Sequence, residues 1–143
     1  MSGTQIHSND IIVDYYPGAY GLTIRIGTNH VSSAQQIRNI FLHLAQSQNA
    51  EVEFQKVVPV RKTNIASLLL KRVPIGKEQM RKLEHVQTIA DGPVFVWTRD
   101  SDGWMECAEK LDWILRKGNP GHQYLTVEGV DDALIEFAFR EIE

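Results

Sequence analysis

The sequence predicts an α+β fold, a two-layer sandwich in which two amphipathic helices cover one face of a mainly antiparallel sheet. Two separate segments, one after Ser32 and one after Asp100, repeat apolar residues at three- and four-residue spacing. Several shorter segments alternate apolar and polar residues instead, as half-buried strands do. The predicted order is strand, helix, several strands, helix, strand. Consecutive strands between the helices favour an antiparallel meander that both apolar helix stripes cover.

The first helix is predicted to begin at one of two serines and to run for roughly four turns. Ser32 and Ser33 are N-cap candidates, and each is followed three residues later by a glutamine. This is the capping-box spacing, in which a hydroxyl and an amide each satisfy a free backbone N–H. The residues of its predicted apolar face are Ile37, Ile40, Phe41, Leu44 and Ala45.

The second helix has clearer ends. Asp100, Ser101 and Asp102 offer N-caps, and an acidic side chain suits the positive end of a helix dipole. Gly118 follows the last turn and Pro120 prevents continuation, which predicts the C-terminus. The residues of its predicted buried face are Trp104, Cys107, Ala108, Leu111, Ile114 and Leu115.

Five segments are predicted to be strands, and one segment stays open between two structures. The predicted strands are residues 22–26, 52–54, 65–73, 94–98 and 135–139. Residues 77–90 fit a helix because Met80, Leu83 and Val86 recur at three-residue steps. They also fit a hairpin strand, because they lie between two strand candidates joined by short turns.

Length and composition predict one domain covering residues 1–143, with a loose N-terminal segment over residues 1–10. The chain is 43% hydrophobic and 23% charged, which is ordinary for a folded protein and is enough to bury a core without metals or disulfides. No internal repeat or low-complexity tract is visible in the sequence. We therefore expect a single hydrophobic core.

The sequence lacks the features that several classes of protein require. A formal net charge of -3 argues against a nucleic-acid binder, and no apolar run is long enough for a membrane span. A single cysteine, Cys107, and no signal-peptide core favour a reducing, cytoplasmic location. The five histidines are not spaced for a metal and no nucleotide fingerprint occurs, so no cofactor is expected.

One polar segment, residues 118–126, is a candidate for chemistry. His122 could act as an acid or base, with Asp131 or Asp132 orienting it and Tyr124 donating a hydrogen bond. The structural interpretation is that the same side chains bond to the backbone of their own loop. We favour the structural interpretation, because one histidine with unplaced acids is weak support for catalysis.

Three tyrosines near a Pro-Gly loop are candidates for partner binding. Tyr15, Tyr16 and Tyr20 are close in sequence, and aromatic side chains in a loop can anchor a partner. They can equally close the edge of a core. Both alternatives remain open from the sequence.

Several short motifs in the sequence resemble those of a known group of proteins. They are Tyr16-Pro17-Gly18, Gly92-Pro93-Val94, Trp104 with Cys107 and Ala108, and Pro120-Gly121-His122-Gln123-Tyr124-Leu125-Thr126 followed by Asp131-Asp132-Ala133. The chain resembles a group of short bacterial proteins of unassigned function that end in this last motif. In size and plain composition it is also similar to bacterial immunity proteins, which neutralise a cognate toxin by binding.

These observations favour a non-catalytic protein-binding domain, such as an immunity, inhibitor or accessory protein. The mild acidity suits a basic protein partner. One alternative is a small enzyme that uses the His122 loop. Another is a homo-oligomeric structural domain, most simply a homodimer formed through an exposed strand edge or aromatic patch.

Overall fold

The computed structural model describes residues 10–18, 21–74, 82–126 and 134–141, and over these residues it contains nine strands and three helices. The helices are α1 (Val31–Gln46), α2 (Phe54–Val57) and α3 (Ser101–Lys117). The strands are β1 (Ile11–Gly18), β2 (Gly21–Thr28), β3 (Glu51–Glu53), β4 (Val60–Thr63), β5 (Ser67–Arg72), β6 (Lys82–Ile89), β7 (Gly92–Arg99), β8 (Gly121–Tyr124) and β9 (Leu134–Phe139). The predicted α+β class is confirmed.

The sheet layer consists of two mixed sheets. The five-stranded sheet has the order β4-β1-β2-β9-β8, and the four-stranded sheet has the order β3-β5-β7-β6. The pairs β1–β2, β3–β5, β6–β7 and β8–β9 are antiparallel, whereas β1–β4, β2–β9 and β5–β7 are parallel. Antiparallel pairs are the majority, as predicted, but a single meander is not formed.

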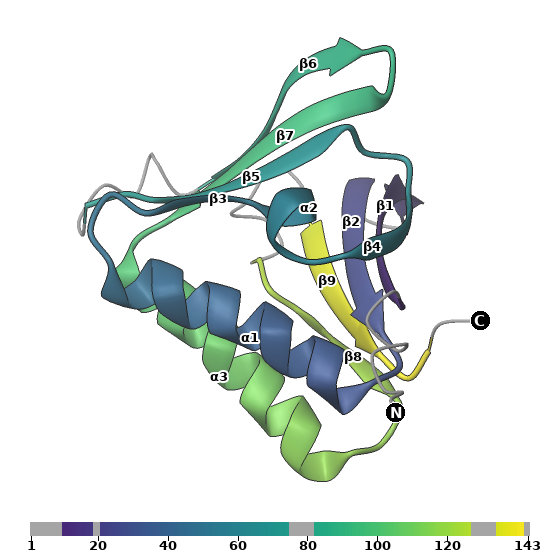
Figure 1. Cartoon of the computed structure of the whole chain (residues 1–143), viewed down its shortest axis with the longest axis vertical. Helices are drawn as coiled ribbons and strands as arrows, with labels where there is room; N and C mark the ends of the chain where they lie inside the picture. Colours follow the sequence, from purple (N-terminus) through teal and green to yellow (C-terminus); the bar gives the residue numbers. More distant parts are fainter. Residues whose placement is uncertain (1–9, 19–20, 75–81, 127–133, 142–143) are drawn as a thin grey trace, which may run out of the picture.

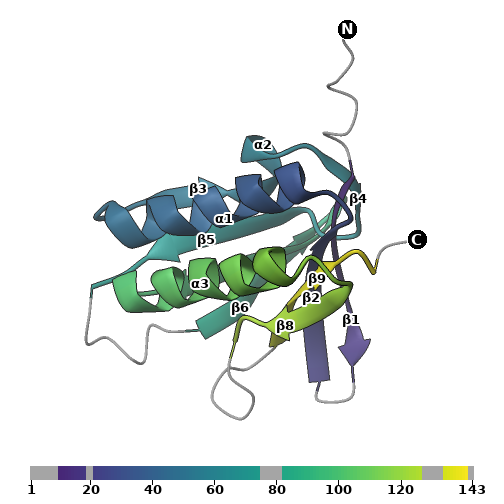
Figure 2. The same cartoon turned by 90° about the horizontal axis from the view of Figure 1, so that it is seen from below.

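The two long helices lie side by side and close the angle between the sheets (Figure 1). They run antiparallel: the Ser101 hydroxyl at the start of α3 donates to the carbonyl oxygen of Ala45 at the end of α1, at 2.8 Å. Figure 2 shows both helices on the same side of the sheet layer. The two amphipathic helices predicted to share one face are therefore confirmed.

The fold repeats one topological unit, although the sequence shows no internal repeat. The elements β1-β2-α1-β3-β5 and β6-β7-α3-β8-β9 have the same order, with α2 and β4 inserted into the first unit. Each hairpin is completed by the other unit, because β2 pairs in parallel with β9 and β7 pairs in parallel with β5. This exchange joins the two units through both sheets.

The start of α1 differs from the prediction. The helix begins at Val31, and its N-cap residue, His30, makes no side-chain capping bond. Ser33 is buried, and its hydroxyl donates to Oδ1 of Asp10 at 2.8 Å. The capping boxes predicted at Ser32 and Ser33 are therefore wrong, because a carboxylate from outside the helix binds the serine.

The ends of α3 agree with the prediction. The side chain of Asp100 accepts a hydrogen bond from the Gly103 amide at 2.8 Å. At the other end, Gly118 adopts the left-handed conformation with φ 70°, which suits a glycine. Cys107 is buried on the inner face of this helix, and burial raises the pKa of its thiol to about 11. The thiol is a core group rather than a nucleophile.

The structure shows which secondary structure the remaining predicted segments form, wherever it describes them. Four predicted strands, 22–26, 65–73, 94–98 and 135–139, overlap β2, β5, β7 and β9. The open segment 77–90 forms strand β6 from residue 82 onward, while residues 77–81 lie outside the described residues. β3 ends at Glu53, because Phe54 begins α2. The polar segment 118–126, expected to be a loop, contains β8.

Asp10 joins β1 to the end of β2 and the start of α1, which predicts an effect on stability. Its pKa is lowered: burial raises it, but hydrogen bonds from Thr28, Ser33 and the Asn29 amide lower it more. We expect Asp10→Ala to reduce the free energy of unfolding at pH 7 by about 1–2 kcal/mol. Because the folded pKa lies below the ordinary 3.8, this contribution is complete above pH 3.8 and is lost as the pH falls below it.

Urea unfolding at pH 7 and at pH 3 checks this prediction. The difference between the native chain and Asp10→Ala should shrink at the lower pH. The exposed turn residue Asp91 provides the control, since Asp91→Ala should change stability little at either pH. An Asp10→Ala effect that is equal at both pH values would contradict the assigned role of the carboxylate.

Candidate functional site

The outer face of the five-stranded sheet is the face that points away from α1 and α3. Side chains alternate along each strand, so residues whose neighbours enter the core belong to this face. On β1, Ile11 and Val13 are buried in the core, and Asp14 and Tyr16 follow on alternate positions of the strand. Tyr15 points inward with the core residues, where its ring contacts that of Phe95 with 5.8 Å between centroids.

A row of charged and aromatic residues crosses the outer face over four strands. Asp14 of β1 lies opposite Arg25 of β2, which lies opposite Glu136 of β9. Glu136 in turn lies opposite Tyr124 of β8. Residues that are paired across strands share one face, so all four side chains emerge together.

Hydrogen bonds hold Asp14, Arg25 and Glu136 of this row. Arg25 donates from Nε and Nη2 to the two carboxylate oxygens of Asp14, at 3.2 and 3.1 Å. The hydroxyl of Tyr16 donates to Oε1 of Glu136 at 3.3 Å. Burial and the neighbouring Glu136 carboxylate raise the pKa of Tyr16, so the phenol stays protonated and remains a donor.

One more side chain, that of His122, extends the row along β8. The rings of His122 and Tyr124 meet edge to face, with 6.0 Å between their centroids. Nδ1 of His122 lies 3.1 Å from Oε1 of Glu141. Tyr16 and Tyr124 are 38% and 40% exposed, whereas Glu136 between them is buried. We call the set Asp14, Tyr16, Arg25, His122, Tyr124 and Glu136 the outer-face patch.

The outer-face patch combines residues from the two sites that the sequence suggests separately. Tyr16 comes from the tyrosine group, and His122 and Tyr124 come from the polar segment. Tyr15 is separated from Tyr16 because neighbouring strand residues point to opposite faces. Tyr20, Asp131 and Asp132 lie outside the described residues.

Sequence reasoning missed three members of the patch. Arg25 and Glu136 occupy the polar positions of alternating strands, which is the signal that could have found them. Their contact requires the parallel pairing of β2 with β9, and these strands are more than 100 residues apart. Asp14 precedes two of the tyrosines but is placed by the β1–β2 hairpin.

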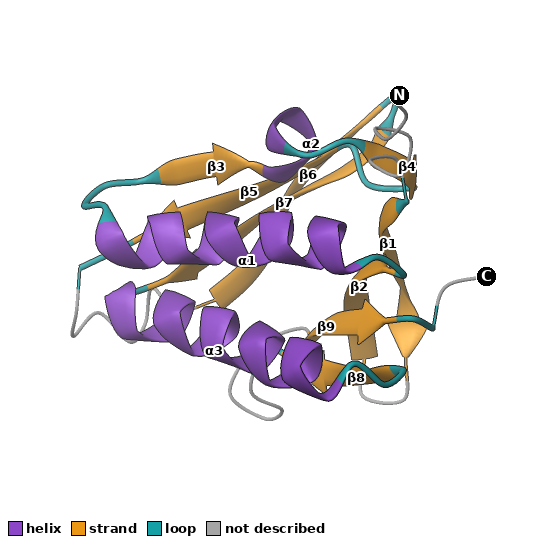
Figure 3. Ribbon diagram, turned by 60° about the horizontal axis from the view of Figure 1, so that its bottom comes forward, coloured by secondary structure: helices purple, strands orange, loops and turns teal. Residues whose placement is uncertain are grey.

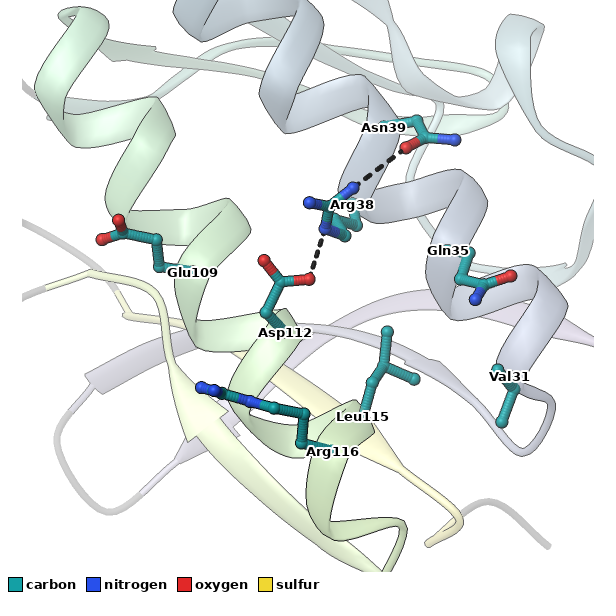
Figure 4. A pocket seen from close by; sticks show the side chains of 8 residues that line it. All are labelled: Val31, Gln35, Arg38, Asn39, Glu109, Asp112, Leu115 and Arg116. Carbon is teal, nitrogen blue, oxygen red and sulfur yellow. Dashed lines mark hydrogen bonds and ion pairs between the residues drawn. The ribbon is translucent and has the colours of Figure 1, made fainter.

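An open groove of about 720 Å³ runs between α1 and α3 on the side away from the sheets (Figure 4). Its charged side chains neutralise one another: Nε of Arg38 donates to Asp112, and Nη1 of the same guanidinium donates to Asn39 at 3.4 Å. Val31 and Leu115 line one end of it. The paired charges favour a bridge between the helices rather than a reactive group.

The catalytic use of His122 stays a prediction, because Asp131 and Asp132 lie outside the described residues. His122 is exposed on an edge strand, and the acid that contacts it is Glu141. Neither His122 nor Tyr124 lines the grooves that border α1 and α3 over the described residues. Among the same residues, no three His, Cys, Asp or Glu side chains lie close enough together to hold a metal ion.

The edge strand β6 bears on the homo-oligomer alternative. Val86 and Ile89 are about half exposed on this strand. The register shifts between His85 and Gln87, which marks a bulge, and the charged Glu84 is also exposed. Bulges and charges on an edge strand oppose pairing with another copy. Self-association through β6 is therefore a weaker prediction than partner binding through the outer-face patch.

Comparisons define no family for this chain: no family model, no curated protein and no solved structure matches it. In the described residues, no helix is long and apolar enough to cross a membrane. The geometry of the fold and of the outer-face patch is therefore the basis for a functional proposal.

Proposed function

We propose that this chain is a non-catalytic protein-binding domain that contacts its partner with the outer-face patch. One observation carries the proposal: two partly exposed tyrosines flank an ordered arginine–carboxylate row on a sheet face that neither long helix covers. An immunity, inhibitor or accessory role in the cytoplasm is the narrower form of the proposal.

The residue types of the patch support binding rather than chemistry. Tyrosine and arginine are over-represented among the residues that contribute most to protein interfaces. Tyr16 and Tyr124 lie on strands, so their backbones are fixed before a partner arrives. Arg25 is held by two hydrogen bonds that it donates to Asp14. Because these groups are already ordered, less conformational entropy is lost on binding.

The charge of the patch favours a basic partner. Asp14, Glu136 and the adjoining Glu141 are carboxylates, and Arg25 is the cation among them. The whole chain carries a formal net charge of -3, which has the same sign. Opposite charge on a partner accelerates association and selects against other acidic proteins.

Affinity capture from cells that naturally express the chain tests the proposal. The immobilised native chain is compared with Tyr16→Ser/Tyr124→Ser and with Val86→Ser/Ile89→Ser, which also replaces two exposed apolar side chains. We expect a defined protein to be retained by the native chain and by the β6 control. Its recovery with the tyrosine variant should fall about tenfold or more. Equal recovery with both variants, or no retained protein, would refute the proposal.

A further inference from the structure

In each repeated unit a long helix lies near an edge strand, α1 near β3 and α3 near β8 (Figure 3), and a groove borders each helix. The first groove lies between α1, β3 and α2, and its α1 residues are Gln36, Asn39, Ile40 and His43. The second lies between α3 and β8, and its α3 residues are Glu106, Glu109, Lys110 and Trp113. Each α3 residue follows its α1 counterpart by 70 positions, so the two grooves are equivalent places in the repeat.

The second groove is filled by a side chain of its own helix. Nζ of Lys110 donates to the carbonyl oxygen of Tyr124 at 2.7 Å, which places the ammonium on the backbone of edge strand β8. The indole of Trp113 borders the same groove. The remaining volume is about 240 Å³. The helix therefore occupies the place that another strand would need.

The first groove has no such lysine. Ile40 stands where Lys110 stands in the second unit, and an isoleucine side chain cannot donate to the β3 backbone. The groove is larger, at about 650 Å³. Its apolar lining includes the buried residues Ile40, Val52 and Val58, while Val57 at its border is 58% exposed.

The backbone of β3 offers hydrogen-bonding groups to this groove. Among the described strands, β3 lies at the edge of its sheet beside β5. The carbonyl oxygen of Ala50 accepts from the Arg72 amide at 2.9 Å, so the peptide groups of residue 50 face β5. Peptide groups alternate in direction along a strand. Those of Val52 thus face β5 as well, and those of Glu51 face away from it.

Two carboxylates, Glu51 and Glu53, and one lysine, Lys56, line the border of the groove. Glu51 pairs with Lys71 at 3.7 Å, and Glu53 pairs with Lys56 at 3.2 Å. Both ion pairs are largely exposed, so each is weak, and another cation can replace its lysine. A basic side chain on an incoming strand would complement these carboxylates.

We propose that the groove between α1 and β3 binds an extended peptide segment of a partner, which adds to β3 as a further strand. The peptide places an apolar side chain against Ile40, Val52 and Val58, and basic side chains on either side of it meet Glu51 and Glu53. Main-chain hydrogen bonds supply affinity and the alternating side chains supply specificity, as in other cases of strand addition. This site is separate from the outer-face patch and does not depend on it.

Binding of a labelled peptide tests the proposal directly. The probe is fluorescein-labelled Lys-Val-Lys-Val-Lys, and the measurement is fluorescence anisotropy with the full chain. We expect saturable binding that weakens as salt is raised. A Glu-Val-Glu-Val-Glu peptide, and a Lys-Val-Lys-Val-Lys peptide methylated on alternate backbone nitrogens, should bind about tenfold more weakly or less. Absence of saturation up to about 1 mM, or equal binding of the methylated peptide, would overturn the proposal.

Two variants locate the peptide in the first groove. Glu51→Lys/Glu53→Lys should weaken binding about tenfold, whereas Asp91→Lys/Glu109→Lys, with the same change in net charge, should not. Ile40→Lys copies the filled second groove and should also abolish binding. Circular dichroism melting confirms that each variant is folded, and the methylated peptide tests the native chain independently of any variant. Equal weakening by the two charge-reversal variants would refute the assignment to this groove.

Discussion

Trp104→Ala should reduce the free energy of unfolding by about 4 kcal/mol, the largest effect expected of a single substitution in this chain. The indole is fully buried and lies 4.7 Å from the ring of Trp97 and 5.8 Å from that of Phe41, between centroids. Its Nε1 donates to the carbonyl oxygen of Lys71 at 3.1 Å. One side chain thus joins α3 to α1 and to two strands of the four-stranded sheet.

Trp113→Ala provides the matched control, because it removes the same side chain from the same helix. Trp113 is 47% exposed, and its main contact is the ammonium of Lys117, 4.8 Å from the ring centroid. We expect this change to cost less than about 1 kcal/mol. Urea unfolding of both variants measures the contrast, and similar losses for the two tryptophans would contradict the packing described for α3.

Arg99→Ala should have the second largest effect, a loss of about 3 kcal/mol. The guanidinium is 4% exposed at the end of β7, and Nη1 donates to the carbonyl oxygen of Leu125 at 2.7 Å. Nη2 lies 3.5 Å from the carboxylate of Glu106. Removing the side chain leaves that buried carbonyl with the weak donor Sγ of Cys107, at 3.9 Å, and opens a cavity beneath α3.

Arg99 fits beneath α3 because Gly103 has no side chain. A substitution at Gly103 therefore gives a second test of this packing. A Cβ atom at Gly103 would lie 2.5 Å from Nε of Arg99, so the guanidinium uses the space that a side chain would fill. Gly103→Ala should therefore destabilise the native chain, and it should destabilise the Arg99→Ala variant less, because only the 3.0 Å approach to the Cβ of residue 99 then remains. Arg116→Ala on the exposed side of α3 is the control for loss of a cation. Additive effects of the Arg99 and Gly103 changes would disprove the contact.

Local patterns were sufficient to predict the α+β class and both long helices. The 3.6-residue periodicity identified α1 and α3, and Asp100 and Gly118 marked the ends of α3 because capping depends on residues within the element. The capping of α1 was not predictable in this way. Asp10 reaches Ser33 only after β1 and β2 have paired, and no local sequence rule contains that contact.

The exchange between the two units was also hidden from the sequence. Local alternation indicates a strand but does not say which strand it pairs with. The parallel pairing of β2 with β9 unites residues from both ends of the chain, and it creates the contacts among Arg25, Tyr16 and Glu136. The pairing of distant strands therefore brings the candidate site together. The sequence alone identified three of its residues, His122, Tyr124 and Tyr16, as candidates.

The proposed binding role of the outer-face patch is tested most directly by site-specific photocrosslinking. A benzoylphenylalanine replaces Tyr16, Tyr124 or, as the control on β6, Val86, and the chain is irradiated in cells that naturally express it. Protein binding through the patch predicts one heavier adduct of the same mass from positions 16 and 124, with none from position 86. The absence of an adduct at both tyrosine positions, or the same adducts at all three positions, would contradict the account.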